Sequence, residues 1–122
     1  AKTERSAWHS QLELLKLQQQ YWLRRLEQCL HGEDETQPRW PVATAKKSHL
    51  GRWLERQKSE RSVDRQLLER LERAQEQQHR LAQLMWRSRQ EGRGAEAAEQ
   101  FKKLLEVNLE IVQLLEHCEL LF

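Results

Sequence analysis

Polar residues that could do chemistry interrupt the apolar pattern of the chain at a few positions. In the third apolar segment, Gln75 and His79 (or the adjoining Gln78) stand on a stripe where a helical bundle would carry leucine. His9 adjoins the inner side of the first segment, and Asn108 interrupts the last one. A buried polar group without a partner costs about 1 to 3 kcal/mol, so such residues on facing helices should meet. The pattern therefore predicts one polar turn in an apolar core.

The residues alone leave two interpretations of this polar turn open. A hydrogen-bonded layer would fix the register of packed helices. A ligand or metal site would use the same place, because helical bundles build such sites from side chains on facing helices. Zinc prefers Cys, His, Asp and Glu, and the amide of Gln75 is a weak ligand beside His79. Heme binding through His9 and His79 is a minor alternative, since the chain carries no heme attachment motif. We expect the layer, and no metal.

Signatures of catalysis are missing from the sequence. It contains no Gly-rich phosphate loop, no nucleophile elbow, no HExxH and no CxxC. Its 21 basic and 19 acidic residues give a net charge of +2, which is not the global footprint of a nucleic-acid-binding protein. Basic residues exceed acidic ones between Lys46 and Arg61, where a solvated helix face is favoured over nucleic-acid binding. We therefore expect a non-enzymatic segment with no cofactor and no nucleic-acid partner.

The cysteines and the apolar runs indicate the compartment. Cys29 and Cys118 sit among helical apolar residues, which is typical of buried thiols in a reducing environment. The chain starts without the apolar core of a signal peptide, and no run approaches the roughly 18 apolar residues of a membrane span. The last residues, CELLF, end inside an apolar helical run. We expect 1–122 to be one cytoplasmic domain of a longer protein, without membrane contact.

The elements that must position these residues are helices, because Leu, Glu, Gln, Arg and Lys are abundant and Gly and Pro are few. The spacing predicts helices over 6–30, from about 44 through AKKSHLGRWLERQ, over 62–90 with Ser62 at its start, and from about 95 to the end. Short joins favour an all-α, antiparallel four-helix bundle. The predicted inner residues are Trp8, Leu12, Leu15, Trp22, Leu26, Cys29, Leu50, Trp53, Leu54, Leu68, Leu71, Ala82, Met85 or Trp86, Phe101, Leu104, Leu105, Ile111, Leu115 and Cys118.

The same polar residues carry a family resemblance. The order His9, then Ser48-His-Leu-Gly-Arg-Trp53, then Gln75-Glu-Gln-Gln-His79 resembles the chemoreceptor zinc-binding (CZB) domain of bacterial chemoreceptors and diguanylate cyclases. That family has a His on its first helix, a Cys-x-hydrophobic-Gly-x-aromatic step on the second and His-x-x-x-His on the third. His9 and His79 match two ligands, whereas Ser48 replaces the Cys and Gln75 replaces a His. The resemblance covers nearly the whole chain and implies a degenerate zinc site.

The resemblance implies a regulatory sensor and dimerisation domain of a bacterial signalling protein. We expect a homodimer attached to a signalling output domain, with a diguanylate cyclase following the domain as the first choice. The alternatives are a chemoreceptor and a ligand-free helical dimerisation or adaptor module. Because Ser48 provides no thiolate, zinc is only a weak alternative. A hydrogen-bonded quartet of His9, Ser48, Gln75 and His79 is expected to join the helices instead.

Overall fold

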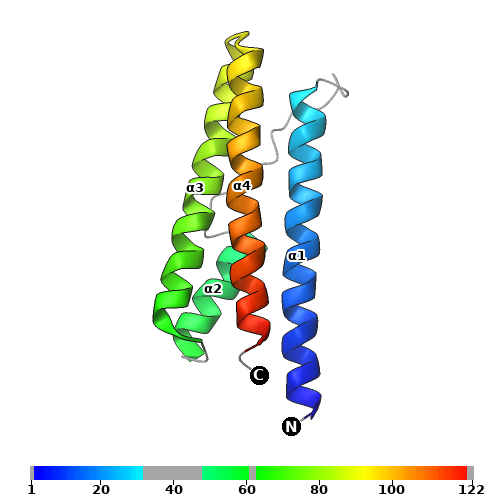
Figure 1. Ribbon diagram of the computed structural model, residues 1–122, viewed down its shortest axis with the longest axis vertical. Coiled ribbons are helices and arrows are strands. Elements are labelled where there is room, and N and C mark those ends of the chain that lie inside the picture. Colours follow the sequence, from blue (N-terminus) through cyan, green and yellow to red (C-terminus); the bar gives the residue numbers. More distant parts are fainter. Residues whose placement is uncertain (1, 32–47, 61–62, 121–122) are drawn as a thin grey trace.

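The computed structural model describes residues 2–31, 48–60 and 63–120, which are almost entirely helical. Helix α1 spans Lys2–Leu30, α2 spans His49–Glu60, α3 spans Arg65–Gln90 and α4 spans Gly94–Glu119. These ranges contain no strand. Consecutive helices run in opposite directions, and the two ends of the chain lie at the same end of the bundle (Figure 1). The predicted all-α bundle is confirmed.

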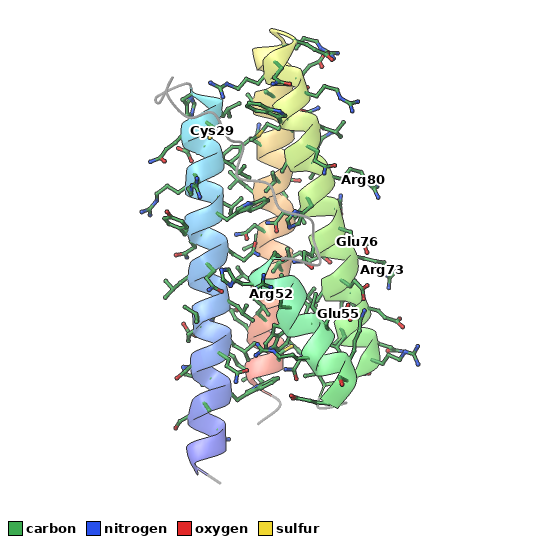
Figure 2. The ribbon with its side chains drawn as sticks, turned by 180° about the vertical axis from the view of Figure 1, so that it is seen from behind. Cys29, Arg52, Glu55, Arg73, Glu76 and Arg80 are labelled. Carbon is green, nitrogen blue, oxygen red and sulfur yellow. The ribbon has the colours of Figure 1, made fainter. Side chains whose placement is uncertain are left out.

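The helices do not contribute equally to the bundle. Helices α3 and α4 form a long antiparallel hairpin, and α1 packs along α4 (Figure 1). Helix α2 is much shorter and covers only the lower part of the hairpin. Seen from behind, it lies between α1 and α3 (Figure 2). The lower half of the bundle therefore contains four helices and the upper half three.

Local residue chemistry explains where α3 and α4 begin. The predicted helix start at Ser62 lies outside the described residues. Asp64 is the N-cap of α3, and its carboxylate accepts a hydrogen bond of 3.1 Å from the backbone N–H of Gln66. The turn between the two helices places Gly92 at φ +76°, a left-handed conformation that glycine adopts without steric cost. Both elements follow the predicted boundaries closely.

The buried apolar residues form two clusters, one in each half of the bundle. The larger lower cluster draws on every helix, whereas the upper one draws only on α1, α3 and α4. The partly buried side chain of Leu81 packs against both. The lower cluster comprises Trp8, Leu12, Leu15, Leu50, Trp53, Leu54, Val63, Leu67, Leu68, Leu71, Ala74, Val107, Ile111, Leu114, Leu115 and Cys118, and the upper one Leu23, Leu26, Ala82, Met85, Ala97, Phe101 and Leu104.

Most predicted inner residues are buried, with one clear correction. Leu105 is exposed, because Leu104 takes the inward position and the next residue lies about 100° further around the helix. Trp22 is only partly buried and packs against the upper cluster. Cys29 and Cys118 are buried free thiols, as expected. Within the described residues, no helix has both the length and the apolar character needed to cross a bilayer.

Candidate functional site

The register of α1 against α4 brings two polar side chains to one level of the bundle. The indole Nε1–H of Trp8 donates a 2.9 Å hydrogen bond to the backbone carbonyl oxygen of Cys118. Both helices advance about 1.5 Å per residue and run in opposite directions. Counting inward from this hydrogen bond, Gln19 of α1 reaches the level of Asn108 in α4. Both lie between the lower and upper apolar clusters.

The register of α3 against α4 adds a third amide at this level. Ser88 Oγ donates a 3.0 Å hydrogen bond to Gln100 Oε1 near the top of the hairpin. Counting down from this pair, Gln78 arrives within about one helical turn of Asn108. We call this region the polar layer; its members are Gln19, Gln75, Gln78, His79 and Asn108, with Ser48 at its edge. It is the polar turn that the sequence predicts.

Several amide groups of the polar layer make no hydrogen bond. Gln78 is fully buried, and neither its Oε1 nor its Nε2 has a partner. The buried Oε1 of Gln19 and Oδ1 of Asn108 are likewise unpaired. Each such group costs about 1 to 3 kcal/mol. The layer is therefore the least favourable part of the core and has hydrogen-bonding capacity to spare.

One side of the polar layer is closed by a contact between α2 and α3. Gln75 Nε2 donates a hydrogen bond to Ser48 Oγ. The same oxygen accepts a 3.0 Å hydrogen bond from the backbone N–H of Gly51, which is one of the otherwise unpaired donors in the first turn of α2. Ser48 thus caps α2 and binds α3 with one hydroxyl. The structure brings these two sequence-predicted residues together.

His79 lies one turn further along α3 and is also buried. Its imidazole packs against the indole of Trp22 of α1, with ring centroids 5.3 Å apart and a tilt of 31°. Three of the four predicted residues, Ser48, Gln75 and His79, therefore follow the inner side of α3. The contact with Trp22 connects this row to α1.

His9 does not join that row, which corrects the predicted quartet. Its side chain is 61 % exposed, and its Nδ1 lies 3.0 Å from Glu119 Oε2 at the lower end of the bundle. Trp8 takes the inward position, and the next residue lies about 100° around the helix. The α1 residue at the level of the layer is Gln19. The sequence held a signal for it, because the inner stripe skips from Leu15 to Trp22, and Gln19 fills that gap.

The donor set of the polar layer favours hydrogen bonding over metal coordination. It consists of amides, one hydroxyl and one imidazole, all of which are neutral when His79 is unprotonated. Structural zinc is usually held by thiolates, imidazoles and carboxylates. Only His79 belongs to that set. The layer can therefore bind a species that donates and accepts hydrogen bonds, but its residues do not fit a tight zinc site.

The described part of the basic segment carries charges of both signs. Arg52 and Glu55 of α2 both reach the outer surface, and the outer face of α3 carries Arg73, Glu76 and Arg80 in alternation (Figure 2). Alternating charges of this kind are typical of a solvated helix face. Lys46, Lys47 and Arg61 lie outside the described residues.

Surface hollows lie away from the polar layer. A groove of about 370 Å³ between α1 and α2 is lined by Gln11, Leu14, Leu15, Gln18, His49, Arg52, Trp53 and Arg56. A second one, of about 670 Å³, lies between α2 and the start of α3. Neither contains the unpaired amides. Comparison of the chain with protein-family models, curated proteins and solved structures finds no match.

Proposed function

We propose that this chain is a non-enzymatic regulatory sensor and dimerisation domain of a bacterial signalling protein. In this proposal the attached output is a diguanylate cyclase, with a chemoreceptor as the alternative. The observation that carries it is the hydrogen bond from Gln75 to Ser48 in the core. These residues stand at two ligand positions of the CZB-like pattern, and a contact between them is what that pattern requires of its second and third helices.

The polar layer supplies a physical basis for regulation. Apolar clusters above and below it hold the helices firmly, whereas the amides of Gln19, Gln78 and Asn108 lack partners. A second packing of α1 that satisfied these groups would differ little in free energy from the observed one. A signal that favours one packing then shifts the population between them. Movement of α1 relative to α4 would carry that shift to the output.

An apolar stripe on the outer face of α1 supports dimerisation. Leu14, Leu17 and Tyr21 are 54 %, 60 % and 64 % exposed and occupy successive turns. By helical geometry, this outer stripe points away from the core residues of α1. Contiguous exposed apolar side chains mark interaction sites more often than isolated ones do. We therefore place the homodimer contact on α1. The same stripe also favours the second candidate, a ligand-free dimerisation module.

Restoring the family ligands tests the site assignment. The triple variant Gln19→His, Ser48→Cys, Gln75→His retains His79 and thereby places a Cys and three imidazoles in the layer, a complete tetrahedral zinc set. We expect it to bind one more equivalent of zinc than the parent chain, measured by elemental analysis. Cobalt substitution should give the absorption bands of a tetrahedral thiolate site.

The matched control adds His79→Leu to the triple variant and should lose the additional metal. If the triple variant is helical by circular dichroism yet binds no more zinc than the parent, the layer does not correspond to the CZB ligand positions. The sensor proposal then fails, and the ligand-free dimerisation module remains.

Substitution in the outer stripe tests dimerisation. Leu17→Lys places a charge in the centre of the stripe and should convert a sedimenting dimer of the chain into a monomer, because a desolvated charge opposes association. Leu84→Lys, at an exposed leucine of α3, is the control and should leave the dimer intact. A parent chain that sediments as a monomer at all concentrations would contradict both candidate functions.

A further inference from the structure

A cluster of charged side chains joins α1 to the end of α4, well below the polar layer. His9 and Glu13 stand four residues apart on α1, and Glu119 approaches them from α4. His9 Nδ1 lies 3.0 Å from Glu119 Oε2, and His9 Nε2 lies 4.0 Å from Glu13 Oε1. One donor atom from each residue lies within 4.8 Å of the other two. We call these three residues the terminal cluster.

The terminal cluster already holds a cation. Lys16 Nζ lies 2.7 Å from Glu13 Oε1 and 2.6 Å from Glu119 Oε1, so one ammonium group bridges both carboxylates. The hydrogen bond to Glu119 is the main cause that raises the pKa of Lys16 above its usual range. The hydrogen bond from Lys16 is likewise the main cause that lowers the pKa of Glu13. Positive charge between the two carboxylates is therefore favoured.

The backbone beneath the terminal cluster is held in place. Trp8, next to His9, is buried in the lower cluster, and Cys118, next to Glu119, is fully buried. The 2.9 Å hydrogen bond between the Trp8 indole and the Cys118 carbonyl joins these neighbours directly. The donors of α1 and α4 thus face each other across a fixed helix contact. Only side-chain rotations are needed to bring them to metal-bonding distance.

We propose that His9, Glu13 and Glu119 bind a divalent transition-metal ion, with Zn²⁺ as the best fit, by displacing the ammonium of Lys16. One imidazole nitrogen and two carboxylate oxygens give three protein ligands, and water completes a tetrahedral shell. The imidazole selects for a transition metal over Mg²⁺ or Ca²⁺, which prefer oxygen ligands throughout. The ion clamps the start of α1 to the end of α4. This site is separate from the polar layer and does not depend on its function.

Calorimetric titration of the purified chain with ZnCl₂, and in parallel with MgCl₂, tests the site. The parent chain should bind one equivalent of zinc and no magnesium. Lys16→Met should raise the zinc affinity, because the competing ammonium is removed. His9→Gln and Glu13→Gln should each lower it by about tenfold or more. Both replaced side chains are exposed, so the variants should fold normally.

His49→Gln is the matched control, since His49 is an exposed histidine of α2 outside the cluster, and it should leave the titration unchanged. Zinc should also shift the ¹⁵N resonances around residues 9, 13 and 119 in the parent chain. The proposal is overturned if His9→Gln binds zinc as tightly as the parent. It is equally overturned if neither the parent nor Lys16→Met binds the metal.

Discussion

The lower and upper halves of the bundle share three long helices but differ in how they are filled. The lower half buries two indoles, those of Trp8 and Trp53, whose ring centroids lie 5.7 Å apart. The upper half relies on Phe101 and Met85 beside the small side chains of Ala82 and Ala97. The difference comes from α2, which adds a fourth wall only below. The polar layer lies where that extra wall begins, so helix coverage and core polarity change together.

The first way to break this comparison is to make the boundary apolar. Gln78→Leu replaces a fully buried, unpaired amide with a side chain of similar volume, and it should raise the free energy of unfolding by about 1 to 3 kcal/mol. Urea denaturation of the purified chain measures this change. The two apolar clusters would then meet through the core.

The matched control is Gln75→Leu, which removes the donor to Ser48 Oγ and should lower the free energy of unfolding instead. Opposite signs at two glutamines one turn apart would separate the unpaired side of the layer from its paired side. A loss of stability in Gln78→Leu as large as that in Gln75→Leu would mean that both amides are satisfied.

A smaller effect should distinguish the two halves through their thiols. Cys29 lies near the upper end of α1, and Cys118 lies in the lower cluster. Because fewer helices cover the upper half, local opening should expose Cys29 more often. In single-cysteine variants, Cys118→Ala or Cys29→Ala, a thiol reagent should label Cys29 about tenfold faster than Cys118, equivalent to about 1.4 kcal/mol. Equal rates would mean that the halves open together.

The same thiols give the pH dependence a sign. Burial raises the pKa of the Cys118 thiol to about 12 from its ordinary value of 9.0. A group whose pKa is raised on folding stabilises the protein fully below its unfolded pKa. This contribution should therefore be lost as the pH rises from 9.0 toward 12, and labelling of Cys118 should accelerate over the same range.

Helix periodicity predicted most of the fold but not the membership of the polar layer. Spacing identifies the face on which a residue lies, and Gln75 was visible because it interrupts leucines on that face. Spacing does not say which residues of two different helices share a level. His9 was therefore grouped with Gln75 although it lies near Glu119, and Gln19 was overlooked. The level depends on register, which is set by distant contacts such as the one between Trp8 and Cys118.

The shared hydroxyl of Ser48 has a consequence for the order of folding. Helix α2 has 12 residues, about the length below which an isolated helix is marginal in water. Its first turn is capped by the same oxygen that receives Gln75 of α3. Nucleation of α2 and its docking on α3 are therefore one kinetic event. Helix α2 should form late, on a hairpin that already exists.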